Sequence, residues 1–170
     1  MADSDQIGGP VVHPHHYNQG GPIDADGSAQ FETIKIIEDL GWGFAFCMGN
    51  ALKYVLRAPH KGAEIEDLKK AQWYLLRARS HRGLVRPRAN QKLTANDVVA
   101  AWGLLEGPAA QAAASAALAQ PEVDSEYIEG VDRLHGIRLA LTVNAIMIGD
   151  PHDALNNLNL YLLKLSAERG

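Results

Sequence analysis

Residues 66–77 read EDLKKAQWYLLR, and residues 153–164 read DALNNLNLYLLK. When the two stretches are aligned on Tyr74 and Tyr161, each ends in Tyr-Leu-Leu followed by a basic residue. Apolar side chains recur in both at the spacing of an amphipathic helix. Two related helical hairpins packed about a pseudo-two-fold axis would produce this repeat. A chance likeness between two amphipathic helices would also produce it, so the sequence leaves both interpretations open.

Helical patterns continue outward from the repeat in both directions. Apolar spacing and capping signals predict helices over residues 30–40, 44–58, 63–80, 94–105, 108–120, 122–148 and 152–167. No segment between them has the pattern of a β-strand. The expected fold is therefore an all-α antiparallel helical bundle, in which two helical hairpins, about 44–80 and 130–167, lie side by side.

Composition divides the chain into four parts. Residues 1–28 are rich in glycine and proline and predict an irregular N-terminal arm. Residues 29–80 hold the first helices, and residues 81–92 form a basic connector that contains no acid. This connector is either a solvated linker or an anion-binding segment. Residues 93–170 are expected to form a second helical half packed on the first.

Charge and cysteine content exclude several classes of protein. The chain has 170 residues, 46% of them hydrophobic, and a net charge of −4, which argues against specific nucleic-acid binding. Its single cysteine permits no disulfide within the chain and indicates a reducing compartment. The polar N-terminus does not resemble a signal peptide, and no apolar run approaches the roughly 20 residues of a membrane span. We expect a soluble cytoplasmic protein that contacts no membrane.

A polar stripe on the predicted helix 44–58 is the main candidate for chemistry. On a helical wheel, Asn50, Lys53 and Arg57 lie together beside Gly49, opposite the expected core face. An amide, an ammonium and a guanidinium group in one stripe suit a phosphate group, and glycine lets a ligand approach the backbone closely. An ordinary solvated helix face has the same composition, so spacing alone does not decide between the two.

Two carboxylates and an amide mark the predicted helix 63–80. Glu64 and Asp67, three residues apart at the edge of the core stripe, would either bind Mg²⁺ for a nucleotide or complement the helix dipole. Gln72 lies near the centre of that stripe, where an unsatisfied amide costs about 1–3 kcal/mol, so it should bond another helix or a ligand base. We expect Asp67 and Arg57 to lie off the core, so that substitution of either leaves the fold intact.

The N-terminal arm contains histidines followed by a tyrosine, in the order His13-Pro14-His15-His16-Tyr17. No second group of histidines or cysteines completes a structural zinc site. His16 and Tyr17 instead suit stacking on a base or hydrogen bonding to a phosphate. The chain lacks the Gly-x4-Gly-Lys-Ser/Thr segment of a P-loop, and it lacks the Gly-x-Ser-x-Gly, Cys-x-x-Cys and Gly-x-Gly-x-x-Gly motifs.

Several motifs follow one another in a specific order over about residues 11–78. They are His13-Pro14-x-His16-Tyr17, a Gly-Gly pair, Gly49-Asn50-Ala51-x-Lys53-Tyr54-x-x-Arg57, Lys61-Gly62, and Glu66-Asp67-Leu68-Lys69-Lys70-Ala71-x-Trp73-Tyr74-Leu75. This pattern resembles the SaV-like family of small bacteriophage proteins. One branch of that family is similar to a phage nucleotide kinase without a P-loop. The resemblance implies nucleotide handling and does not extend to residues 93–170.

Binding of a nucleoside phosphate is therefore the preferred hypothesis, with phosphate transfer to a nucleoside monophosphate as the finer one. Phosphoryl transfer depends on positioning and charge neutralisation more than on covalent chemistry. Lys53, Arg57 and Lys61 would neutralise phosphate oxygens, and Glu64 and Asp67 would hold Mg²⁺.

The other candidate site residues have supporting roles in this hypothesis. Asn50 and Gln72 would orient the ligand, and His16 and Tyr17 would close over it. Three alternatives stay open. The first is a nucleotide-binding protein without activity that sequesters a signalling nucleotide, and the second is a structural interaction module. The third is a helical nucleotide pyrophosphatase, for which the second hairpin offers only two acids. The alanine-rich stretch 108–120, together with Trp102, predicts a homo-oligomer, most simply a dimer.

Overall fold

The computed structural model describes residues 21, 22, 25, 32–81, 93–105, 112, 115, 116 and 136–169. All regular secondary structure in this part of the chain is helical, which confirms the predicted fold class. The remainder of the arm, the connector after residue 81 and most of the predicted helices 108–120 and 122–148 lie outside the described residues. None of the described helices combines the length and the apolar character that a membrane crossing requires.

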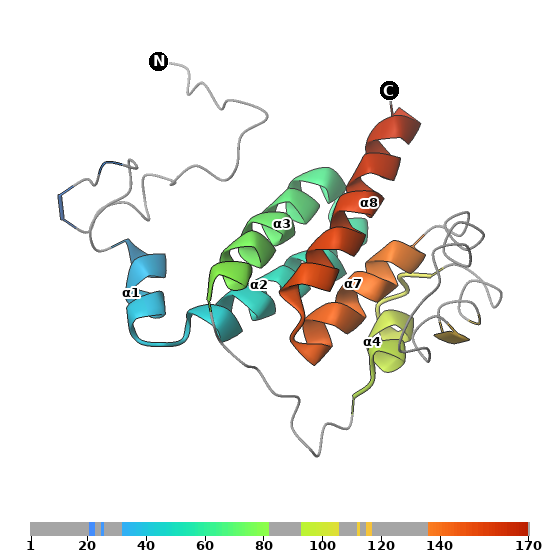
Figure 1. Cartoon of the computed structure of the whole chain (residues 1–170). Coiled ribbons are helices and arrows are strands. Elements are labelled where there is room, and N and C mark those ends of the chain that lie inside the picture. The colour runs from blue at the N-terminus through green and yellow to red at the C-terminus, as the bar shows by residue number, and fades with distance from the viewer. Residues whose placement is uncertain are drawn as a thin grey trace.

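Two antiparallel hairpins form the body of the molecule (Figure 1). The elements are α1 (Thr33–Asp39), α2 (Gly43–Arg57), the 3₁₀ turn η2 (Ala58–His60), α3 (Glu64–Ser80), α4 (Ala95–Ala101), α7 (Ile137–Ile148) and α8 (Pro151–Arg169). The first hairpin is α2–α3 and the second is α7–α8; α3 packs against α8, and α2 packs against α7. The side-by-side arrangement of the two hairpins is confirmed.

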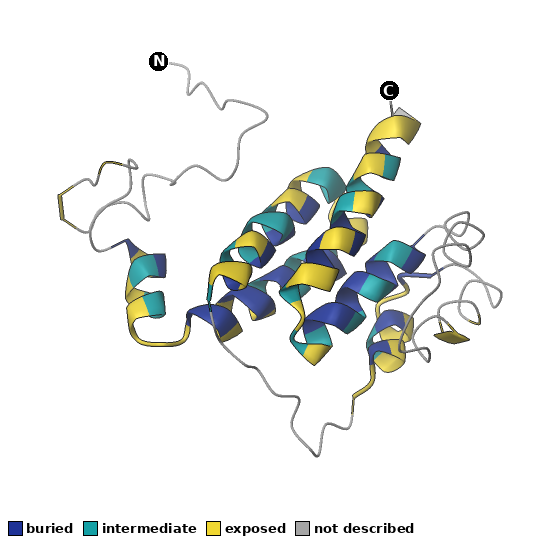
Figure 2. Ribbon diagram, in the orientation of Figure 1, coloured by how far each residue is buried: buried dark blue, intermediate teal, exposed yellow. Residues whose placement is uncertain are grey.

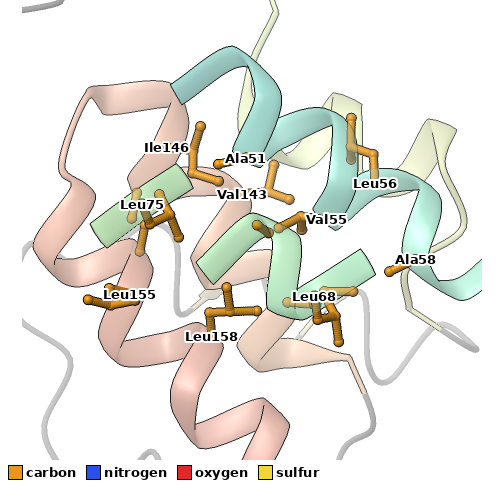
Figure 3. Close-up of a cluster of buried hydrophobic side chains, with 14 of the residues drawn as sticks. Ala51, Val55, Leu56, Ala58, Leu68, Leu75, Val143, Ile146, Leu155 and Leu158 are labelled. Carbon is orange, nitrogen blue, oxygen red and sulfur yellow. The ribbon is translucent and has the colours of Figure 1, made fainter. Parts of the chain in front are cut away.

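The hydrophobic core lies between the hairpins (Figure 3). Its fully buried large side chains include Val55 of α2, Leu68 and Leu75 of α3, Val143 of α7 and Leu158 of α8. Each such side chain contributes about 1.5–3 kcal/mol relative to an exposed one. Figure 2 shows the buried residues along the inner faces of the four helices and the exposed residues along their outer faces. The amphipathic periodicity of the sequence therefore decides which face of each helix is buried.

A hydrogen bond between the two halves supports the pseudo-two-fold interpretation. Gln72 Nε2 donates to Asn159 Oδ1 at 2.8 Å. When the repeat is aligned on its tyrosines, Gln72 and Asn159 occupy equivalent positions. Contact between equivalent positions is what a two-fold axis produces. Of the two partners expected for Gln72, this structure provides another helix.

Two glycines set helix boundaries that differ from the prediction. Helix α4 ends at Ala101 rather than at residue 105, because Gly103 has a φ of +59°. Helix α7 begins at Ile137, because Gly136 before it has a φ of +93°; the part predicted from residue 122 to residue 135 lies outside the described residues. A Cβ atom at Gly136 would also lie 2.2 Å from the Leu104 carbonyl oxygen. Only glycine combines this left-handed conformation with so close an approach.

Glu38 fastens α1 to the first hairpin. It forms an ion pair with Arg77, whose Nη2 donates to Glu38 Oε2 at 2.8 Å, and His81 Nε2 lies 2.8 Å from Glu38 Oε1. Burial tends to raise the pKa of Glu38, but the hydrogen bonds from Arg77 and His81 outweigh it, so the pKa is lowered. Beneath this cluster, Cys47 is fully buried, and burial together with the charge of Glu38 raises its thiol pKa to about 11.

Candidate functional site

An arginine–aspartate pair joins the end of α2 to the first turn of α3. Arg57 Nε donates to Asp67 Oδ2 at 2.6 Å, and Arg57 Nη2 donates to Asp67 Oδ1 at 2.7 Å. The Asp67 side chain is 1% exposed, whereas the Arg57 side chain is 33% exposed. The guanidinium group is thus fixed from the inside by a two-point contact, with its outer edge toward the solvent.

The burial of Asp67 corrects the expectation that this side chain lies off the core. Asp67 faces inward with Leu68 and Ala71, whereas Leu76 of the same helix is 45% exposed. The physical reason is the partner: a buried carboxylate is tolerated when an opposite charge and hydrogen bonds compensate its lost hydration. The expectation that substitution of Asp67 or Arg57 leaves the fold intact therefore no longer holds.

The electrostatics of the site follow from this pair. Hydrogen bonds from Arg57 lower the pKa of Asp67, although burial opposes the shift, and the same contact raises the pKa of Arg57. Both groups therefore stay ionised near neutral pH. The pKa of Lys53 is lowered, first by partial burial and then by the positive charge of Arg57. Two cations are held close enough to repel each other.

Aromatic rings support the two cations. Lys53 Nζ and Arg57 Cζ each lie 4.5 Å from the centroid of the Tyr54 ring. Tyr54 stacks on Tyr74 of α3 with centroids 5.7 Å apart and an interplanar angle of 18°. Cation–π contacts of this kind hold a charge over a ring face. The wheel of α2 did not identify Tyr54 as part of the site; its signal was its position, next to Lys53 and three residues before Arg57.

The structure brings together the polar stripe predicted on α2. Asn50 donates to the Phe46 carbonyl oxygen at 2.9 Å and accepts a hydrogen bond from Lys53 Nζ at 2.7 Å. Lys61 lies exposed in the turn before α3, and its charge also acts to lower the pKa of Asp67. His16 and Tyr17 lie outside the described residues.

The two predicted metal ligands have protein partners. Both carboxylate oxygens of Asp67 accept hydrogen bonds from Arg57, and Glu64 Oε1 accepts one from the Tyr161 hydroxyl at 3.0 Å. Within the described residues, no three or more histidine, cysteine, aspartate and glutamate side chains are grouped to hold a metal ion. This arrangement does not fit a Mg²⁺ site at Glu64 and Asp67, and Mg²⁺ stays a prediction.

Comparison with known proteins connects only the first part of the chain to a family. The model of a family described as a protein of unknown function, DUF3310, matches residues 11–76. Comparisons with curated proteins and with solved structures find no match. The matched stretch contains α1, α2 and most of α3, and all nine candidate residues from His16 to Gln72 lie inside it. The α7–α8 hairpin lies outside it.

Proposed function

We propose that the protein binds a nucleoside phosphate on the outer face of α2, with Lys53 and Arg57 contacting the phosphate. The observation that carries the proposal is the Arg57 guanidinium group, which is fixed by buried Asp67 and stacked on Tyr54 while a third of its side chain is exposed. A guanidinium group held in this way loses little conformational entropy when it binds an oxyanion.

The second cation strengthens the case for an anionic ligand. Lys53 and Arg57 share one aromatic ring, and the charge of Arg57 lowers the pKa of Lys53. A phosphate placed against both would remove their repulsion and supply charge-assisted hydrogen bonds, which contribute about 1.5–3 kcal/mol each. In this proposal Asp67 is a positioning residue that holds Arg57, rather than a metal ligand.

Phosphate transfer to a nucleoside monophosphate is the finer form of the proposal. Its support is the resemblance of residues 11–78 to the SaV-like phage proteins, and the need of phosphoryl transfer for positioned positive charge. Binding without transfer is the competing outcome. An assay for a nucleoside diphosphate product, with and without Mg²⁺, separates them, because a sequestering protein forms no product under either condition.

Binding is tested with a variant that leaves the buried pair intact. Lys53→Ala removes an exposed cation and should weaken binding of nucleoside mono-, di- and triphosphates in isothermal titration by roughly 10-fold or more. Arg79→Ala removes the same charge at the other end of α3 and should leave the affinity unchanged. Equal affinities for wild type and Lys53→Ala would mean that the stripe is only a solvated helix face.

A homo-oligomer is also part of the proposal. Trp102 directly follows α4 and is 43% exposed. The alanine-rich stretch 108–120 comes shortly after it in the sequence. Burial of such an aromatic side chain against a second copy would stabilise a dimer. Light scattering at micromolar concentration should give a mass well above the 18.4 kDa of one chain. A mass equal to one chain would remove this part of the proposal.

A further inference from the structure

We propose that the base of the bound nucleotide stacks on Phe46, so that α2 alone presents a stripe that runs from the base to the phosphate. The inference rests on the proposed function, because the phosphate at Lys53 and Arg57 fixes one end of the ligand. It adds the other end, and it assigns a role to an aromatic side chain that the helical wheel left out of the site.

The periodicity of α2 aligns Phe46 with the two cations. Phe46 precedes Lys53 by seven residues and Arg57 by eleven, which puts all three within about 20° of one line along the helix. Phe46 is 37% exposed. Its ring meets Tyr74 at an interplanar angle of 67° with centroids 6.1 Å apart, so the ring is held in place by an edge-to-face contact.

The helix surface beyond Phe46 is open. Gly49 is exposed, and a Cβ atom built on it would meet no atom within 4 Å. Glycine in the middle of a helix costs roughly 0.5–1 kcal/mol relative to alanine, and the space here would accept alanine. A ligand that lies against the exposed backbone between Phe46 and the cations would explain why glycine occupies position 49.

The length of the stripe suits one nucleotide. Lys53 bends back toward the start of α2, because its Nζ bonds Asn50 Oδ1 at 2.7 Å. Its ammonium group therefore lies close to the level of Asn50, about four residues or roughly 6 Å along the axis from Phe46. A base on Phe46 and its first phosphate on Lys53 bridge such a span, with the sugar over Gly49.

Aromatic stacking also predicts the specificity. Every base has a π-face, so a stacking platform accepts several bases and contributes about 1–3 kcal/mol per base. Trp42, one turn before Phe46, is 63% exposed and extends the aromatic surface. We therefore expect Phe46 to favour nucleotides over base-free phosphates, with little preference among the bases.

The test compares a nucleoside monophosphate with ribose 5-phosphate, which has the same phosphate and no base. Phe46→Leu should weaken binding of the nucleotide by roughly 5- to 150-fold and leave the affinity for ribose 5-phosphate unchanged. Phe46→Trp should retain nucleotide binding. Leu163→Ala, which removes an exposed apolar side chain from α8, should change neither affinity.

A second variant keeps the test decisive if Phe46→Leu fails to fold. Gly49→Leu leaves Phe46 and both cations in place and obstructs the surface between them, so it should weaken nucleotide binding at least 10-fold. If wild type binds the nucleotide in a Lys53-dependent way and neither variant weakens this binding, stacking of the base on Phe46 is overturned while the proposed function stands. If wild type binds neither ligand, the proposed function fails, and this inference fails with it.

Discussion

The two hairpins bury equivalent positions with different chemistry. In α3, Asp67 is fully buried, and the aligned residue of α8, Ala154, is fully buried as well. The same site in a helical hairpin therefore accepts either a carboxylate or a methyl group. The carboxylate is accepted in the first hairpin because Arg57 binds both of its oxygens.

Charge follows the same division. Residues 43–81 carry seven basic and three acidic side chains, whereas residues 136–169 carry three of each. When the hairpins are aligned on Asn50-Ala51 and Asn144-Ala145, Lys53 falls on Met147 and Arg57 falls on Pro151. A buried ion pair often adds little stability compared with an apolar pair of similar volume. Ala154 is fully buried in α8 without an ion pair, so a hairpin of this kind can pack without one. The proposed role of Arg57 in ligand binding would account for the pair in the first hairpin.

The strongest test of this comparison moves the acid to the second hairpin. Ala154→Asp buries a carboxylate at a position where the aligned partner is a proline, and should cost about 3–5 kcal/mol from the unpaired charge, with overpacking adding about 1–3 kcal/mol. Urea unfolding at pH 7 measures the change. Asn156→Asp adds the same charge on the exposed face of α8 and should cost little. A small cost at position 154 would mean that the two sites are not equivalent.

Breaking the pair in the first hairpin should cost nearly as much. Arg57→Met leaves Asp67 buried without its partner, and the free energy of unfolding should fall by about 3–5 kcal/mol. Adding Asp67→Ala, which copies the second hairpin, should restore most of the loss. The comparison fails if the double variant is no more stable than Arg57→Met alone, because the pair would then be needed for packing itself.

A smaller effect is expected where the second hairpin contacts an acid of the first. Tyr161→Phe removes the hydrogen bond to Glu64 and should lower the free energy of unfolding by about 0.5–1.5 kcal/mol. The same substitution in a Glu64→Ala background should cost less, since the acceptor is already gone. Equal costs in the two backgrounds would show that the hydroxyl bond contributes nothing.

The smallest effect is a difference in pH dependence between the hairpins. The pKa of Asp67 is lowered in the fold, so its contribution is present above the unfolded value of about 3.9 and is lost as the pH falls through the folded value. The pKa of Asp153 is raised, by partial desolvation and by the charge of Asp150. Its contribution is therefore present at acid pH and is lost as the pH rises through the folded value.

Denaturant unfolding from pH 3 to pH 7 separates the two carboxylates. The stability lost by Asp67→Ala should be constant above about pH 5 and should shrink below about pH 4. Asp153→Asn should increase stability slightly near pH 7, and this gain should disappear in acid. The change in unfolding free energy caused by each variant should vary with pH in opposite directions. Variation in the same direction for both variants would contradict the pKa shifts.

Periodicity and capping predicted most of the described fold, because helix formation and the choice of buried face depend on residues close in sequence. The two hairpins and the α2 stripe both follow from such local patterns. Burial of Asp67 did not follow, because it depends on an arginine ten residues away in another helix. The start of α7 was missed as well, since the approach of Leu104 to Gly136 is a tertiary contact.

Because Cys47 is buried, the reactivity of its thiol can be used to measure local opening of the helices around it. This thiol is the only one in the sequence, it is fully buried in α2, and its pKa of about 11 keeps it protonated. Alkylating reagents require an accessible thiolate, so the rate of labelling should report how often α2 separates from α1 and α3. A ligand that binds the outer face of α2 should slow that labelling, and mass spectrometry of unmodified protein can follow it.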